Sequence, residues 1–180
     1  MKRIVIFASG SGTNAQNIIQ YFNERPSAKV VLVLSNKKNA KVLERANKLN
    51  VNNTYFQKED LNDPNGVLSL LKKEEPDLIV LAGFLLKFPK FILDEYPNKV
   101  INIHPALLPK YGGKGMYGRH VHESVIDNQE SESGISIHYV NEFYDEGAIL
   151  FQKSIPVEKE DTPDSLAEKI HQLEYRYFPK

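Results

Sequence analysis

Short runs of β-branched and aliphatic residues alternate with amphipathic segments over the first 104 residues. The apolar runs predict buried parallel strands at residues 3–8, 29–35, 53–56, 77–83 and 98–104. The segments between them show helical spacing and predict helices at residues 15–22, 40–49 and 66–75. Strands that alternate with helices indicate βαβ units, so we expect an α/β fold with a Rossmann-like, doubly wound, mostly parallel sheet.

The pattern changes after residue 104. A glycine-containing loop, PALLPKYGGKGMYG, precedes a predicted helix at 119–128. Two segments with strand-like alternation follow, at 134–140 and 147–157, and predict an antiparallel C-terminal hairpin at the sheet edge. The last segment, 162–178, is predicted to be a helix with Thr162 as its N-cap and Pro163 at its first position. No linker is visible, so we expect residues 1–180 to form a single domain.

Composition excludes several classes of protein. The 23 basic and 23 acidic residues give a formal net charge of zero, which argues against a broad nucleic-acid or membrane-binding surface. The absence of cysteine excludes disulfides, a thiol nucleophile and a cysteine-based zinc site. The first apolar run resembles a strand more than a signal peptide, and no apolar stretch approaches the ~20 residues of a membrane helix. We therefore expect a soluble, cytoplasmic protein.

A glycine loop, SGSGTN, follows the first predicted strand. Glycines let the backbone approach an anion, and the N–H groups at a helix start attract phosphate. The third glycine of the dinucleotide fingerprint and the Lys-Ser/Thr of a P-loop are both missing, and Ser35 and Asn36 stand where a ribose-binding acid is expected. Two interpretations stay open: a cradle for a single phosphate, or a tight turn capped by Thr13 or Asn14.

Asn102 and His104 lie at the end of the fifth predicted strand, where Pro105 stops the ladder. Residues two apart on a strand point to the same side, and open α/β sheets bind ligands at the carboxyl ends of their strands. We therefore expect both residues near the glycine loop, joined by Asp145 from the hairpin loop. Asp145 can equally be a turn residue that bonds its own backbone.

The remaining histidines give weaker signals. His120 and His122 lack the i, i+4 spacing that places two ligands on one helical face, so a metal site is disfavoured. His138 alternates with Ile137 and Tyr139, and packing explains it as well as function does.

Asn, His and Asp without a nucleophilic Ser or Cys suit direct acyl transfer to an amine. The substrate supplies the nucleophile, and the protein stabilises the tetrahedral oxyanion. Asn102 can donate an N–H to that oxygen, His104 can donate or shuttle a proton, and Asp145 can orient the imidazole or take the amine's proton.

The segments INIHPALLPKYGG and GISIHYVNEFYDEGAIL together resemble the folate-dependent formyltransferase superfamily over nearly the whole chain. SGSGTN narrows the resemblance to the branch that formylates glycinamide ribonucleotide with 10-formyltetrahydrofolate. The resemblance implies that Asn102, His104 and Asp145 are catalytic. It implies ribonucleotide contacts from Gly12, Thr13, Asn14 and Glu174. It also implies that the folate is bound by Phe84, Leu85, Leu86, Lys87, Phe88, Asn141, Glu142, Phe143 and Tyr144.

The chain departs from the superfamily pattern in places. Ala106 replaces a commoner Ser. Leu86 stands where many relatives have an Arg and is followed by Lys87, so we expect a basic side chain to contact the folate's glutamate tail from a shifted position. The loop before residue 119 is longer than usual, and His120 is taken as the match to the superfamily's loop histidine. A tRNA formyltransferase would need an additional, basic RNA-binding domain. The 180 residues and the zero net charge argue against that alternative. A 10-formyltetrahydrofolate hydrolase and a non-catalytic nucleotide-binding module stay open, as do a monomer and a homodimer.

Overall fold

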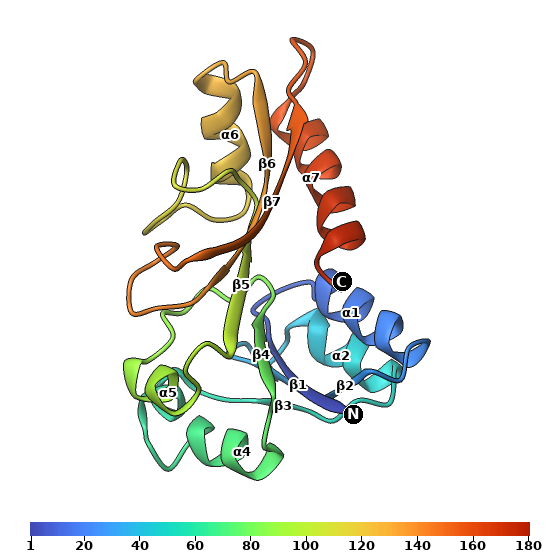
Figure 1. Ribbon diagram of the computed structural model, residues 1–180, viewed down its shortest axis with the longest axis vertical. Coiled ribbons are helices and arrows are strands. Elements are labelled where there is room, and N and C mark those ends of the chain that lie inside the picture. The colour runs from blue at the N-terminus through green and yellow to red at the C-terminus, as the bar shows by residue number, and fades with distance from the viewer. The chain divides into compact units, whose positions relative to one another are not determined.

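The structure is a computed structural model that describes residues 1–180 (Figure 1). Contacts divide the chain into two compact units, Met1–Ile101 with Pro179, and Asn102–Phe178 with Lys180. We describe each unit by itself, and the single-domain organisation stays a prediction. None of the helices is both long and apolar enough to cross a membrane.

The first unit holds a parallel sheet covered by helices. Strand β1 pairs in parallel with β2 and β4, and β2 pairs in parallel with β3, giving the order β3-β2-β1-β4. Its elements in chain order are β1 (Lys2–Phe7), α1 (Thr13–Asn23), β2 (Ala28–Ser35), α2 (Lys41–Lys48), β3 (Asn53–Tyr55), α3 (Lys58–Asn62), α4 (Val67–Glu74), β4 (Leu78–Leu81) and α5 (Lys90–Glu95).

The core of this unit explains the apolar runs. Val5, Ile6 and Phe7 of β1 are completely buried, as expected for a central strand with both faces covered. Helices α1 and α2 pack on β2, and α4 packs on β1. The predicted strands and the three predicted helices are confirmed, with ends that differ by a few residues. The short helices α3 and α5 were not predicted.

The second unit begins inside β5 (Val100–His104), which follows β4 in the sheet order. Strands β6 (Glu132–Tyr139) and β7 (Ile149–Pro156) complete the order β5-β6-β7, and β7 is the edge strand. Figure 1 shows β6 and β7 running side by side as a long pair, and their register is antiparallel. The predicted C-terminal hairpin and the mostly parallel sheet are thus confirmed.

Helices α6 (Arg119–Asp127) and α7 (Pro163–Tyr177) pack against each other, and α7 also packs on β6. Thr162 caps α7, because its side chain accepts a hydrogen bond from the Ser165 N–H at 3.2 Å. Pro163 occupies the first turn, where its missing N–H costs nothing. Both features confirm the predicted start of this helix.

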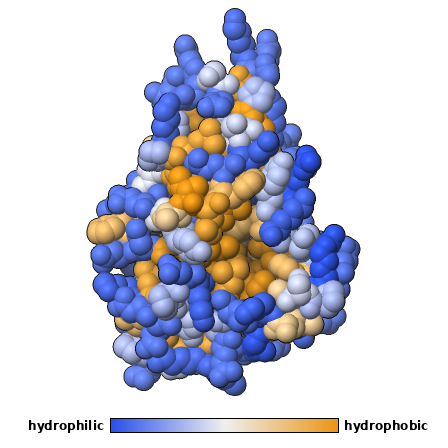
Figure 2. All heavy atoms as spheres, in the orientation of Figure 1, coloured by the Kyte–Doolittle hydropathy of each residue, from blue (hydrophilic) through white to orange (hydrophobic).

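Strand β7 exposes apolar side chains at the sheet edge. Ile149, Leu150 and Phe151 are all exposed, although strand alternation points successive side chains to opposite faces. Figure 2 shows apolar side chains at the surface over the part of the view in which β7 runs. The Phe151 ring lies 5.2 Å from the Tyr177 ring of α7 in a tilted arrangement, so α7 contacts this edge.

Candidate active site

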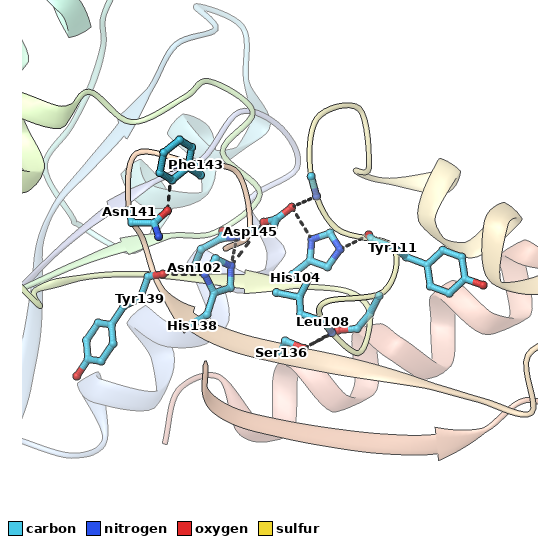
Figure 3. A network of polar contacts seen from close by, with 12 residues as sticks. Asn102, His104, Leu108, Tyr111, Ser136, His138, Tyr139, Asn141, Phe143 and Asp145 are labelled. Atoms are coloured by element: carbon cyan, nitrogen blue, oxygen red, sulfur yellow. Dashed lines mark hydrogen bonds and ion pairs between the residues drawn. The ribbon is translucent and has the colours of Figure 1, made fainter. Parts of the chain in front are cut away.

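Asn102 and His104 lie on the last three residues of β5, as predicted, and both belong to the second unit. The strand ends at His104, directly before Pro105, which has no N–H to continue the ladder. His104 is only 3% exposed. A histidine buried this deeply needs hydrogen-bond partners, and Figure 3 shows what surrounds it.

Both ring nitrogens of His104 face an acceptor. Nε2 lies 2.6 Å from the carbonyl oxygen of Tyr111, and Nδ1 lies 3.5 Å from Oδ2 of Asp145. A carbonyl oxygen can only accept, so Nε2 carries a proton and neutral His104 keeps its lone pair on Nδ1. A second proton at Nδ1 would point at the Asp145 carboxylate. The site therefore holds an imidazole that is prepared to gain and release a proton at Nδ1.

Asp145 lies between two histidines. Its Oδ2 also accepts a hydrogen bond from the Gly113 N–H at 3.0 Å, and its Oδ1 lies 3.5 Å from Nε2 of His138. The residue has a left-handed backbone with φ of 57°, a conformation that is uncommon outside glycine and that recurs at functional sites. Gly147 keeps this loop close to β6, since any Cβ there would lie 1.6 Å from the Tyr139 carbonyl oxygen.

His138 orients the Asn102 amide. Its Nδ1 lies 2.8 Å from the Tyr139 carbonyl and must donate to it, so Nε2 is an acceptor while the ring is neutral and faces Asp145 as a donor only when the ring is protonated. In the neutral ring, Nε2 accepts the Asn102 Nδ2–H at 3.1 Å. One Asn102 N–H is thereby fixed, and the second N–H of the same nitrogen has a defined direction in which to donate.

The β6–β7 pairing has an irregularity next to His138. The β6–β7 register shifts between Ile137 and His138, so that Ile137 pairs with Phe151 while His138 pairs with Ile149. Bulges bend and twist a strand and often re-aim side chains beside active sites. Alternation alone did not decide between packing and function for this residue. In the structure His138 is 2% exposed and contacts both Asn102 and Asp145, which places it within the candidate site.

Burial and charge oppose each other in this network. Burial lowers the pKa of His104 below its ordinary value, against the raising effects of the Asp145 charge and of the Tyr111 carbonyl, while His138 lowers it further. Burial acts to raise the pKa of Asp145, but the contacts from His138, His104 and Gly113 outweigh it and the pKa lies below its ordinary value. Asp145 is thus an anion and His104 predominantly neutral near pH 7.

The glycine loop belongs to the first unit and opens α1. Gly12 is the N-cap residue, with φ of 74°, and no side chain caps the helix. The interpretation that Thr13 or Asn14 caps this turn was therefore wrong, because the left-handed Gly12 occupies the capping position. A Cβ on Gly12 would lie 2.4 Å from Cβ of Val42 in α2, so only glycine allows this close approach.

A cation lies beside the same loop. Arg45 of α2 donates through Nε to the Ser11 carbonyl at 2.8 Å, and its guanidinium also contacts the Gln16 side chain. No acidic residue lies in the first turn of α1. Positive charge and an uncapped helix start both favour an anion here.

The first predicted folate segment, Phe84–Phe88, also lies in the first unit. Phe88 is 3% exposed and packs edge-on against Phe7 at 5.2 Å, so its ring belongs to the core. Phe84 is half-buried, Leu85 is exposed, and the exposed Lys87 has no ion-pair partner. Ser9 holds the segment, because its hydroxyl accepts the Leu85 N–H at 3.0 Å and donates to Asn36 at 2.7 Å.

The second predicted folate segment, Asn141–Tyr144, leads into Asp145 in the second unit. Its residues are exposed, and Asn141 Oδ1 accepts the Phe143 N–H at 2.9 Å in a local turn. Glu174 of α7, the predicted glycinamide contact, is buried at 7% exposure. His120 at the start of α6 is exposed, with its ring 3.5 Å from Glu123.

The protein-family model described as formyl transferase matches residues 2–180. Among curated proteins, the chain is 33% identical to the phosphoribosylglycinamide formyltransferase of Bacillus subtilis over 99% of this chain and 92% of that one. It is 35% identical to the Haemophilus influenzae protein of the same name, covering 84% of it. It is also 36% identical to the chloroplastic Arabidopsis thaliana protein of that name, but the chain spans only 63% of that relative's length.

Solved structures match over the same extent. The phosphoribosylglycinamide formyltransferase of Bacillus halodurans superposes with a TM-score of 0.88 at 35% identity, covering 99% of this chain and 92% of that one. Glycinamide ribonucleotide transformylase 1 of Symbiobacterium toebii gives a TM-score of 0.90 at 30% identity, with 99% and 84% covered. The predicted fold class is therefore confirmed.

Proposed function

The chain belongs to the formyl transferase family and, within it, to the phosphoribosylglycinamide formyltransferases, and from this premise we propose that Asn102, His104 and Asp145 perform the formyl transfer. The donor is 10-formyltetrahydrofolate, and the acceptor is the amine of glycinamide ribonucleotide. We place the enzyme in the cytoplasm, as one domain that acts as a monomer or homodimer without metal, membrane or nucleic acid.

One observation supports this assignment most strongly. His104 has an obligatory acceptor at Nε2, the Tyr111 carbonyl, and a carboxylate at Nδ1, Asp145. This arrangement leaves Nδ1 as the only nitrogen of the ring that can take up and give back a proton. General acid–base catalysis requires a positioned group of this kind, with a pKa suited to gaining and losing a proton.

The reaction replaces one C–N bond by another. The substrate amine attacks the formyl carbon, and the carbonyl oxygen becomes an oxyanion in a tetrahedral intermediate. The bond between that carbon and the folate nitrogen then breaks. The amine loses one proton and the folate nitrogen gains one, so the chain's residues have only to stabilise the oxyanion and move a proton.

Asn102 stabilises the oxyanion through its second N–H. Its first N–H is held by His138, whose tautomer is set by the Tyr139 carbonyl. A donor that is oriented before the reaction needs no reorganisation when charge develops, and removal of one such donor costs about 10²–10³-fold in rate in other acyl-transfer enzymes.

His104 and Asp145 handle the proton. Neutral His104 can accept a proton at Nδ1, where the Asp145 carboxylate stabilises the imidazolium that forms. The low pKa of Asp145 keeps this carboxylate ionised, and the lowered pKa of His104 makes the proton easy to release to the folate nitrogen. Asp145 thus orients the imidazole and sets its basicity.

The ribonucleotide binds through its phosphate and its amine-bearing end. We assign the phosphate and ribose region to Gly12, Thr13 and Asn14 at the uncapped start of α1, where Arg45 adds positive charge. Glu174 contacts the glycinamide side. We assign the folate to backbone and side-chain groups of Phe84–Phe88 and Asn141–Tyr144. The Phe88 ring is buried, so it would support this site from the core.

The direct test is a release assay with the purified protein, glycinamide ribonucleotide and a 10-formyl folate analogue. Release of deformylated folate should depend on the ribonucleotide amine. Folate release without the amine would indicate a hydrolase, and no turnover at all would indicate a binding module. His104→Ala should abolish most of the amine-dependent rate while the circular dichroism spectrum and unfolding midpoint stay close to the parent's.

A further inference from the structure

Two side chains from the hairpin hold the segment between His104 and Tyr111. The Ser136 hydroxyl donates to the Ala106 carbonyl at 2.7 Å and accepts the Leu108 N–H at 3.0 Å. Gln152 Nε2 donates to the Leu108 carbonyl at 3.0 Å and to Ser136 Oγ at 2.8 Å. Three backbone groups of this segment are therefore anchored on one pair of side chains.

The pair is a direct cross-strand pair. Ser136 of β6 stands opposite Gln152 of β7 in the antiparallel register, and residues opposite each other present their side chains on one face. Ser136 is fully buried, with its single proton given to Ala106 and both acceptor sites filled. The hydroxyl has no remaining hydrogen-bonding capacity, so its position depends on the group that donates to it from β7.

Position 152 requires a hydrogen-bond donor, and the Gln152 amide supplies it. The Leu108 carbonyl can only accept a hydrogen bond, and the Ser136 hydroxyl already donates its proton to the Ala106 carbonyl. Both contacts with position 152 therefore need a donor. One NH2 group supplies two N–H bonds from a single nitrogen. A carboxylate of the same shape supplies none and would face a carbonyl oxygen instead.

The anchored segment ends at the acceptor of His104. Tyr111 has a left-handed backbone with φ of 57°, and this conformation directs its carbonyl to within 2.6 Å of His104 Nε2. The Tyr111 hydroxyl is held separately by Glu130 at 2.8 Å. The backbone of Tyr111 is thus fixed from one side by its ring and from the other by the anchored Ala106–Leu108 turn.

We propose that Gln152 is a positioning residue for the transfer reaction: through Ser136 and Leu108 it holds the Tyr111 carbonyl on His104 Nε2 and so fixes the tautomer and orientation of the ring. This inference rests on the proposed catalytic role of His104. Gln152 acts through other groups, of which Figure 3 labels Ser136, Leu108, Tyr111 and His104.

The groups that shift the pKa of His104 indicate how a substitution at Gln152 should change that pKa. The Asp145 carboxylate and the Tyr111 carbonyl raise the pKa of His104, while burial, the largest effect, and the His138 ring lower it. If the Tyr111 carbonyl moves away, one favourable group is lost and the others remain. The pKa of His104 then falls, and the ring loses the bond that fixes its tautomer.

The test compares Gln152→Glu and Gln152→Met with Lys153→Ala, a control on the same strand whose side chain makes no hydrogen bond or ion pair. We expect kcat to fall by roughly 10-fold in both Gln152 variants, with KM for each substrate within about twofold of the parent. Met keeps the length of the side chain without introducing a charge, so Gln152→Met still tests the role of Gln152 if Gln152→Glu destabilises the fold.

The second readout is the pKa of His104 in the free protein, followed by NMR of the ring Cε1–H resonance and assigned with His104→Asn. It should move to lower pH in both Gln152 variants and stay unchanged in Lys153→Ala. An unchanged His104 pKa, or a fall in kcat that equals the loss of folded protein, would overturn the inference. Full activity of His104→Ala would instead remove the proposed function, without altering what the NMR shows about Gln152.

Discussion

Asp145 Oδ2 lies 3.5 Å from His104 Nδ1, the one ring nitrogen of His104 that is not committed to a backbone carbonyl. The proposed proton transfer rests on this relationship. The carboxylate is 13% exposed and lies beside a second histidine, so the charge acts at close range with little screening by solvent.

Replacement of Asp145 by Asn should distinguish the effect of the side chain's charge on the rate from the effect of its size. Asp145→Asn keeps the size of the side chain but removes the anion that favours the His104 imidazolium, so we expect kcat to fall by about 10²-fold. The pKa of His104 should fall as well, and the limb of the pH–rate profile that reports it should shift to lower pH. Steady-state rates from pH 5 to pH 9 measure both effects.

Glu146→Gln is the matched control, since it makes the same change of charge one residue away on an exposed side chain. It should change kcat by less than about twofold, because exposed charges are screened. Equal rates for Asp145→Asn and the parent, with the fold intact, would remove Asp145 from the mechanism.

His138 should matter for rate through Asn102. His138→Phe keeps a ring but removes the acceptor that fixes the Asn102 amide, so the oxyanion donor loses its orientation. We expect kcat to fall at least ~10-fold, with a smaller effect on KM for the ribonucleotide. Tyr139→Phe is the control, because this side chain points away from the network in Figure 3. Similar kinetics for both variants would argue that Asn102 is oriented without His138.

The sequence identified three members of this network and left the fourth undecided, for a physical reason. Asn102, His104 and Asp145 follow from strand periodicity and from the segments shared with the superfamily. His138 also lies on a strand, but its contacts with Asn102 and Asp145 depend on how neighbouring segments meet β6, which strand alternation does not reveal. The pairing of Ser136 with Gln152 depends on the β6–β7 register.

The elements missed in the fold have similar causes. Helix α5 covers six residues after Pro89, too short for a helical period to emerge from the sequence. At the start of α1, Thr13 and Asn14 have side chains that commonly cap helices, yet Gly12 holds the N-cap because its left-handed backbone brings the loop against Val42. At Gly12, tertiary packing decided what local preference left open.

That packing makes Gly12 a further test. Gly12→Ala places a methyl group where Val42 already lies and forces alanine into a left-handed backbone, so we expect a loss of at least ~1–2 kcal/mol in the free energy of unfolding. KM for the ribonucleotide should rise, since the loop must shift. Urea denaturation and steady-state kinetics measure the two effects.

Gly10→Ala provides the comparison for stability. A Cβ at Gly10 meets nothing within 4 Å, and its φ is not positive. The free energy of unfolding should therefore stay within about 0.5 kcal/mol of the parent's. Equal destabilisation by both substitutions would mean that the Gly12–Val42 approach does not constrain the loop.

His122 should make the protein sensitive to acid. It is 4% exposed, its Nδ1 has no hydrogen-bond partner, and burial, followed by His171 and His104, lowers its pKa from 6.5 to about 4. Between these two pH values the unfolded chain binds a proton that the folded chain does not. The free energy of unfolding therefore falls as the pH drops from 6.5 towards 4, by about 3 kcal/mol for this group.

The substitution His122→Leu should flatten that pH dependence in urea denaturation at pH 7, 5.5 and 4.5, whereas the exposed His120→Leu should keep the parent's slope. A parental slope in His122→Leu would assign the acid sensitivity to other groups.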